Sequence, residues 1–147
     1  MDQVTLVGPE DLHSLELHIL STYKNNKAVD RTFYIHADTQ ETETQIKNLQ
    51  NSLDKKIIEN FVFINETDLL SPQICSNKWI YQQLLKLSVD KLRNSHNLSE
   101  TFLFTDVDTL CFFTTAKDDL CQNGKYIFYA ATDNEQPVLA DNFQSVP

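Results

Sequence analysis

Glycine and proline are scarce in this chain, with only two glycines and four prolines among 147 residues. Flexible linkers and low-complexity segments are rich in such residues, so neither is expected, and a glycine-rich phosphate-binding loop is absent. Basic residues are also few, because 12 lysines and arginines stand against 21 aspartates and glutamates, a formal net charge of −9. Since binding to a phosphate backbone requires a concentrated basic surface, we expect no nucleic-acid partner.

Cysteines and long apolar runs are lacking as well. Cys75, Cys111 and Cys121 are odd in number and lack metal-site spacing, which argues against a disulfide framework. We therefore expect reduced, mostly buried thiols and a cytoplasmic location. No apolar stretch is long enough to cross a bilayer, and the first residues lack the basic and apolar regions of a signal peptide, so no membrane span is expected.

The remaining composition is that of an ordinary globular domain. Hydrophobic residues make up 41% of the chain and charged residues 22%. A chain of this length fits one compact domain with a real core, but it is small for a complete two-lobed enzyme. We expect a single domain over residues 1–147, without internal repeats.

Strand-like and helix-like patterns alternate along the chain. Apolar, β-branched runs predict strands at 4–7, 31–36 and 57–64, a strand that ends at Asp106, an extended piece at 110–113 and a strand at 125–131. Helical periodicity predicts one helix from 12 to about 23–26 and another that follows a capping box at 38–41. A third helix is expected from 77 to about 93, with Ser76 as its cap, and a short fourth helix near 116–120. This order predicts an α/β fold with a mainly parallel, three-layer sheet flanked by helices, in which ligands collect at the carboxyl ends of the strands.

The most informative stretch is the apolar run that leads into Asp106-Val107-Asp108 and then resumes. An unpaired carboxylate is costly in a buried strand, so the two acids mark the point where the strand emerges into a cleft. Alternation in an extended chain points both carboxylates to the same side, an arrangement that suits a hard divalent cation. The alternative is a solvated turn between two strands.

The helix expected from Asn77 is the second unusual segment. Helical spacing places Ile80, Leu84 and Leu87 on one stripe, which we expect in the core. A neighbouring stripe carries an aromatic ring, an amide, an ammonium and a carboxylate, namely Trp79, Gln83, Lys86 and Asp90. This row suits a sugar hydroxyl or a phosphate, and the alternative is a tryptophan at the core margin with solvated polar neighbours.

These two segments together resemble nucleotide-sugar glycosyltransferases of the GT-A fold. The similarity is to a poorly characterised group in which a Trp-Tyr-x-Gln-Gln-x-x-Lys helix precedes an Asp-x-Asp-Thr strand end, here Trp79–Leu87 and Phe102–Thr109. The opening Val4–Leu12 also looks like the first strand and turn of that group. The resemblance covers the chain from about Val4 to Ala131.

The resemblance implies a Rossmann-like GT-A domain that binds a nucleoside-diphosphate sugar and transfers the sugar to an acceptor that the sequence does not identify. It implies that Asp108 binds Mn²⁺ or Mg²⁺ directly and that Asp106 contacts the metal or the ribose and sugar. Gly8 would lie near the nucleoside, while Gln83 and Lys86 would face the donor. A metal ion in this position draws charge off the departing diphosphate.

The sequence departs from the GT-A pattern in two ways. Many of these enzymes take a further metal ligand, often a histidine, well after the Asp-x-Asp, whereas all four histidines here precede Asp106. Only 39 residues (147 − 108) follow Asp108, where the acceptor-binding half and a catalytic base are expected. One hypothesis is therefore a hexosyltransferase or its donor-binding half. Another is a catalytically inactive binding or oligomerisation module, whose sheet edge near 110–131 pairs with a second copy.

A third hypothesis is a phosphohydrolase of the haloacid-dehalogenase type, in which an apolar strand also ends in Asp-x-Asp. Asp106 would then be the nucleophile and Asp108 the general acid/base. In that class the motif usually opens the domain and is followed by Gly-Thr, whereas Thr109 follows Asp108 directly here.

Overall fold

The structure is a computed structural model that describes residues 1–122, 125–128 and 138–139. Its centre is a parallel four-stranded sheet with the strand order β3-β2-β1-β4. The strands are β1 (Asp2–Val7), β2 (Arg31–His36), β3 (Phe61–Asn65) and β4 (Phe102–Asp106). In this order β1 lies between β2 and β4. It pairs with β2 along its whole length and with β4 along most of its length.

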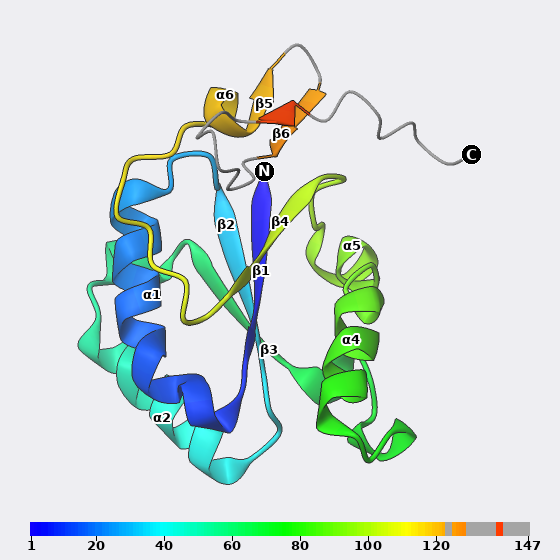
Figure 1. Cartoon of the computed structure of the whole chain (residues 1–147). Coiled ribbons are helices and arrows are strands. Elements are labelled where there is room, and N and C mark those ends of the chain that lie inside the picture. Colours follow the sequence, from blue (N-terminus) through cyan, green and yellow to red (C-terminus); the bar gives the residue numbers. More distant parts are fainter. Residues whose placement is uncertain (123–124, 129–137, 140–147) are drawn as a thin grey trace.

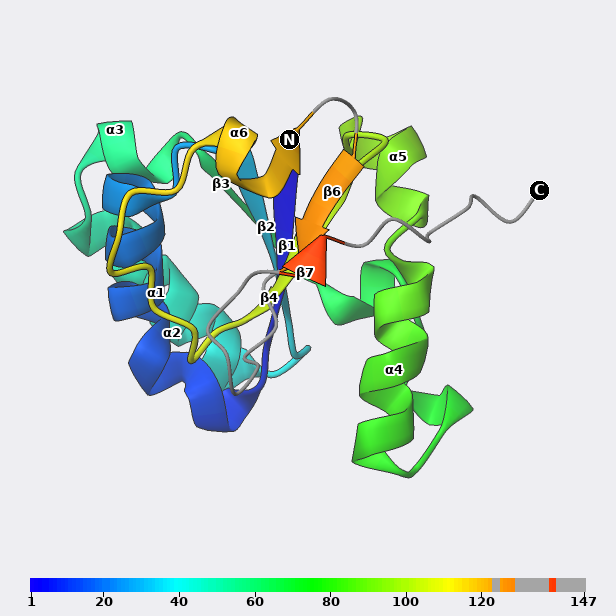
Figure 2. The ribbon, with the colours of Figure 1, turned by 45° about the horizontal axis from the view of Figure 1, so that its top comes forward.

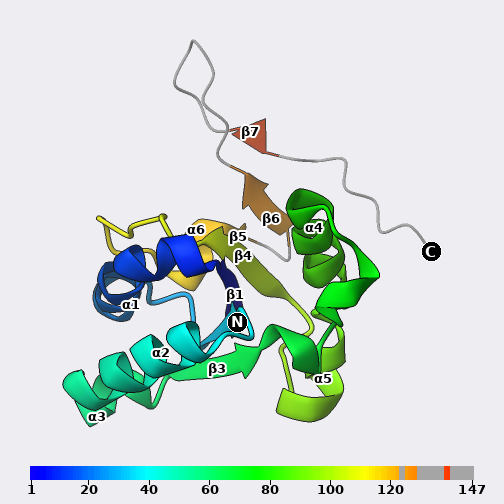
Figure 3. The same cartoon turned by 90° about the horizontal axis from the view of Figure 1, so that it is seen from below.

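Helices cover both faces of this sheet, which confirms the three-layer α/β prediction. Figure 1 and the view from below in Figure 3 place α1 and α2 on one side, and α4 and α5 on the other. The helices are α1 (Leu12–Asn25), α2 (Gln40–Ser52), α3 (Lys55–Ile58), α4 (Lys78–Ser88) and α5 (Lys91–His96). Short 3₁₀ turns follow three strand or loop ends, namely η1 (Pro9–Asp11), η2 (Glu66–Asp68) and η3 (Pro72–Ile74).

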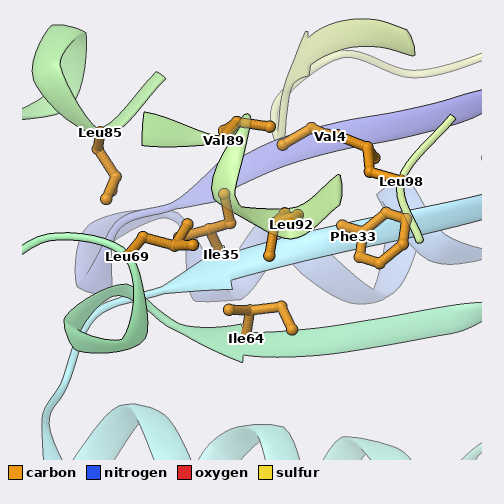
Figure 4. Packing of buried hydrophobic residues seen from close by; sticks show 9 residues of the cluster. All are labelled: Val4, Phe33, Ile35, Ile64, Leu69, Leu85, Val89, Leu92 and Leu98. Carbon is orange, nitrogen blue, oxygen red and sulfur yellow. The ribbon is translucent and has the colours of Figure 1, made fainter. Parts of the chain in front are cut away.

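Each helix layer has its own apolar core against the sheet. Figure 4 shows the cluster on the side of α4 and α5, which contains Val4, Phe33, Ile35, Ile64, Leu69, Leu85, Val89, Leu92 and Leu98. The cluster on the side of α1 and α2 contains Val7, Leu15, Ile19, Tyr34, Ile46, Phe61 and Val107. Because successive strand residues point to opposite faces, strands such as β1 and β2 contribute apolar side chains to both clusters.

The chain leaves β4 in an extended course along α1, which Figures 1 and 2 show in yellow. The backbone of Thr115 exchanges hydrogen bonds with the end of α1, since its N–H donates to Asn25 O at 2.9 Å and its carbonyl accepts from Lys27 N at 2.8 Å. The segment leads to α6 (Lys117–Leu120) and to a small antiparallel sheet of β5 (Cys121–Gln122), β6 (Lys125–Phe128) and β7 (Val138–Leu139).

Most element predictions are close to the structure, and several need correction. The strand expected at 57–64 is shorter, because Asp54 accepts a hydrogen bond from Lys56 N and begins α3, which takes Ile57 and Ile58 into a helix. The capping side chain of α2 is Thr39, which accepts from Thr42 N, so the box expected from Asp38 to Glu41 lies one residue too early.

The long helix expected from 77 to about 93 is divided into α4 and α5. Its cap is Asn77 rather than Ser76, because the Asn77 side chain accepts from Ile80 N at 3.1 Å. The expected core stripe is also wrong, since Ile80 and Leu87 are exposed and the helices bury Leu85, Val89 and Leu92 instead.

In the last part of the described chain, the piece expected to be extended at 110–113 runs along α1 without helix or strand hydrogen bonding. The short helix near 116–120 is present as α6, and the strand expected at 125–131 is present as β6 up to Phe128. Residues 129–131 of that prediction lie outside the described residues. No helix in the described part of the chain has both the length and the apolar character needed to cross a membrane.

Candidate functional site

The predicted site residues meet at the carboxyl ends of β1 and β4. The register pairs Leu6 with Asp106, so the glycine that follows β1 lies beside the acids that end β4. Between these strand ends and α4 lies a hollow of about 340 Å³, which we call the acidic compartment. Its walls are Leu6, Gly8, Asp11, Trp79, Gln82, Gln83, Lys86, Asp106, Val107 and Asp108. Gly8, Gln83, Lys86, Asp106 and Asp108 were all predicted from the sequence, so the fold brings them together.

The turn after β4 aims both acids into this compartment. Val107 is 3% exposed and packs into the core beside α1, while Asp106 and Asp108 on either side of it are exposed. The turn is closed by a hydrogen bond of 3.0 Å from Thr109 N to Asp106 O. The buried valine therefore anchors the turn and leaves the two carboxylates on the solvent side.

α4 supplies the opposite wall. Buried Leu85 holds the helix against the sheet, and the residues on the adjoining face, Trp79, Gln83 and Lys86, line the compartment. Asp90, which the sequence placed on the same stripe, pairs instead with Arg93 on α5. Trp79 is 68% exposed, so its ring forms part of the rim rather than the core margin.

Lys86 is the cation of the compartment. Its Nζ lies 3.8 Å from Oδ1 of Asp106, whose side chain is 75% exposed. A solvated pair of this kind contributes little to stability. The ammonium is therefore held only weakly and is able to move onto a phosphate oxygen.

The donor set suits a metal that arrives with a phosphorylated ligand. Three aspartates line the compartment, Asp11, Asp106 and Asp108. The described residues contain no group of three or more His, Cys, Asp and Glu side chains arranged as a metal cage. Mg²⁺ and similar ions commonly bind through one or two carboxylates together with water and substrate phosphates. Asp106 and Asp108 therefore fit such an ion, with Asp11 as a further carboxylate in the same compartment.

A second hollow, of about 270 Å³, adjoins the acidic compartment and shares Leu6, Gly8 and Gln82 with it. We call it the apolar compartment, because β1, β2 and α4 contribute Leu6, Ile35 and Leu85 to its walls. A Cβ atom on Gly8 would lie 3.0 Å from Asp11 Oδ2 and 3.2 Å from Glu10 Cδ. The absence of a side chain at Gly8 thus leaves room for the side chains of Asp11 and Glu10 at the wall that the two compartments share.

Two polar groups with altered acidity lie on the apolar compartment, Glu66 after β3 and Tyr81 on α4. Burial raises the pKa of the Glu66 carboxyl, a hydrogen bond from Asp38 N opposes this rise, and the negative charge of Asp38 adds to it. Burial and the neighbouring Glu66 raise the pKa of Tyr81 to about 12. Tyr81 is also tied to the fold, since its hydroxyl donates to Leu70 O at 3.0 Å.

A buried pair lies beneath the acidic turn. His18 of α1 and Tyr34 of β2 are both fully buried, with 2.7 Å between His18 Nδ1 and the Tyr34 hydroxyl. Burial lowers the pKa of His18 to about 4, although the negative charge of Asp108 works in the opposite direction. His18 is therefore neutral at physiological pH and part of the support of the site.

Sequence reasoning missed Asp11, Gln82 and Glu66 as site residues. Asp11 and Glu66 follow the ends of β1 and β3 by four residues and one residue, respectively. Applying the rule that ligands collect at strand carboxyl ends to every strand would have found both. Gln82 belongs to the same Gln-Gln pair as Gln83, but helical spacing did not place it on the stripe of Trp79, Gln83 and Lys86, and the tertiary position of α4 turns it toward both compartments.

Searches against profiles of known protein families, curated proteins and solved structures found no match. The functional argument for this protein therefore rests on the geometry and chemistry of the site.

Proposed function

We propose that this protein is a metal-dependent glycosyltransferase of the hexosyltransferase class, or the donor-binding half of one. It binds a nucleoside-diphosphate sugar between β1, β4 and α4 and transfers the sugar to an acceptor that is still to be identified. The observation that carries the proposal is the convergence of Gly8, Gln83, Lys86, Asp106 and Asp108 on one compartment. The adjoining apolar compartment supports it, because a nucleoside diphosphate also has one apolar and one highly charged half.

Each of these residues has its own proposed role in binding the donor. Asp106 and Asp108 would hold Mn²⁺ or Mg²⁺, and Lys86 would turn from Asp106 to the diphosphate. Gln83 would hydrogen-bond a hydroxyl of the sugar, and Gly8 would let the ligand pass close to the backbone. When bound, the metal ion supplies positive charge that stabilises the diphosphate as a leaving group. Such neutralisation is needed in a protein with a net charge of −9.

Binding can be tested by thermal unfolding with Mn²⁺ and nucleoside diphosphates, added separately and together. At a hundredfold excess over Kd, a bound ligand adds about 2.7 kcal/mol of stability, or about 5–10 °C in Tm for a chain of this size. We expect a shift of this order only with metal and nucleotide together. The variant Asp108→Asn should lose it, whereas Asp118→Asn, an exposed acid on α6, should keep it.

Equal stabilisation of wild type and Asp108→Asn, or no stabilisation by any metal–nucleotide pair, would contradict the proposal. Transfer is tested next with radiolabelled sugar nucleotides. Binding without transfer to water or to any saccharide would favour the inactive binding module. Mg²⁺-dependent release of phosphate from a phosphomonoester would favour the phosphohydrolase. A cytoplasmic location and self-association remain predictions from the sequence.

A further inference from the structure

The apolar compartment has a lining that suits an apolar ring beside a charged group. Its volume of about 270 Å³ lies close to the lower end of the range for small-molecule sites, about 300–1,000 Å³. Buried Ile35 and Leu85 form part of its floor, and Leu6 separates it from the acids of the other compartment. If a diphosphate occupies the acidic compartment, its base is directed to this one.

Glu66 is the partly buried carboxylate in this compartment, whereas Glu10 lies exposed at its rim. Both the backbone and the side chain of Glu66 are held in place. It directly follows β3, and its Oε1 accepts a hydrogen bond from Asp38 N at a long 3.4 Å. A carboxylate has about four acceptor sites and no donor when ionised. The Tyr81 hydroxyl is a second hydrogen-bonding neighbour of this carboxyl. With Asp38 and Tyr81 as its partners, the Glu66 carboxylate still has acceptor sites for strong N–H donors and has nothing to offer an acceptor.

The bases differ in what they present to such a group. Guanine carries a ring N–H next to an amino group, and these two adjacent donors match the two oxygens of one carboxylate. Uracil carries one N–H between two carbonyl oxygens, which a carboxylate repels. Adenine and cytosine carry an amino group beside a ring nitrogen that is itself an acceptor. Only guanine therefore satisfies both oxygens without placing an acceptor against the carboxylate.

We propose that the protein selects guanine nucleotides and that Glu66 reads the base through two hydrogen bonds in the apolar compartment. This inference rests on the proposed function, because it assumes that the diphosphate lies beside Asp106 and Asp108. Burial raises the pKa of the Glu66 carboxyl, so its ionised form is poorly solvated and gains from donors supplied by a ligand.

The test is calorimetric titration of the full chain with GDP, IDP, UDP, ADP and CDP in excess Mn²⁺. We expect GDP to bind at least about tenfold more tightly than UDP, ADP and CDP. IDP lacks only the amino group of guanine, so it should bind several-fold more weakly than GDP. This comparison uses the wild-type protein and does not depend on the folding of any variant.

The matched variants are Glu66→Gln and Glu16→Gln, which remove one negative charge each, the second from an exposed position on α1 outside both compartments. Glu66→Gln should reduce the preference for GDP over UDP by about tenfold, and Glu16→Gln should leave it unchanged. Tighter binding of UDP, or equal affinity for GDP, IDP and UDP, would overturn the inference but leave the proposed function standing. No binding of any nucleoside diphosphate with Mn²⁺ would overturn both.

Discussion

His18 is a titratable base enclosed in an apolar layer, and its burial makes the fold less stable at acid pH. Its imidazole lies against the ring of Tyr34 at 5.5 Å between centroids and shares a hydrogen bond with its hydroxyl. An unfolded chain leaves the same imidazole with a pKa near its ordinary value of 6.5, against about 4 in the fold. Between these two values, the unfolded state binds a proton that the folded state does not.

We therefore expect the free energy of unfolding to fall as the pH is lowered from 6.5 to 4. The difference in pKa corresponds to a loss of about 3 kcal/mol over this window. Urea unfolding at several pH values measures it. His18→Asn keeps an atom for the Tyr34 hydroxyl but cannot titrate, so the difference between wild type and this variant should shrink as the pH falls.

The control is His13→Asn, because His13 lies exposed on the same helix. Its unfolding should follow the pH dependence of the wild type. A constant difference between wild type and His18→Asn from pH 7 to pH 4 would show that His18 takes up protons equally in the folded and unfolded states, which would contradict the prediction. Glu66 contributes with the opposite sign, because a carboxyl with a raised pKa loses stability as the pH rises above its ordinary value. This contribution is the same in wild type and variant and cancels in the comparison.

At the level of elements, α4 is the part of the fold on which the site depends most. The helix begins where the Asn77 side chain accepts from Ile80 N, and its residues form walls of both compartments. Replacing a capping asparagine by alanine costs about 1 kcal/mol. We expect Asn77→Ala to lower the free energy of unfolding in urea by this amount and also to weaken binding of Mn²⁺ with a nucleoside diphosphate.

Asn94→Ala is the matched change at an exposed position within α5. It should leave both measurements within about 0.5 kcal/mol of the wild type, because surface substitutions away from caps have small effects. If the two variants behaved alike, the start of α4 would not be fixed by its cap.

The strands were the most predictable elements. β2 matches its predicted bounds, and β4 ends at the predicted Asp106, because apolar β-branched runs bounded by polar residues leave little choice. The start of β3 was wrong, since Ile57 and Ile58 continue the same apolar run but are held in α3 by the Asp54 cap. A local hydrogen bond overrode a strand-like composition there.

The face of α4 was the main failure of sequence reasoning. Two apolar stripes run along this helix, and periodicity alone does not say which of them meets a sheet. The stripe with Leu85 is the buried one because it continues into Val89 and Leu92 across the break between α4 and α5. Leu87, on the other stripe, is 78% exposed.

At the scale of the whole molecule, the net charge of −9 acts on every part of the fold. Mutual repulsion of this excess favours expansion, and salt screens it beyond about 8 Å at physiological ionic strength. We expect Tm to rise when NaCl is increased from about 10 mM to 150 mM. Scanning calorimetry measures the shift, with sucrose of equal osmolality as the control.

A fall in Tm with NaCl would mean that attractive pairs outweigh the repulsion. The strongest of these is Asp2 with Arg31, at 2.7 Å between Oδ2 and Nη2. Asp2 is almost completely buried, so salt should screen this pair far less than it screens the exposed acids.

The location of the candidate site was predictable because it follows from topology more than from detail. Parallel strands bring their carboxyl ends to one edge, which placed Gly8 and Asp106 together before any contact was known. The division into two compartments was not predictable. It depends on how α4 and the segment between Glu66 and Ser76 pack over that edge. The periodicity of α4 does not say which of its faces meets the sheet, and the segment before it carries no periodic signal.

The central position of β1 in the sheet also affects how the sheet forms while the chain is synthesised. β1 is made before β4, and Thr5 meets Thr105 across 100 residues of chain. At about 5–20 residues per second, the nascent strand waits roughly 5–20 s on the ribosome with one edge unpaired. An open edge is a template for joining other chains. The segment that carries Asp106 and Asp108 thus ends the period of greatest aggregation risk, and the candidate site is completed only when that period closes.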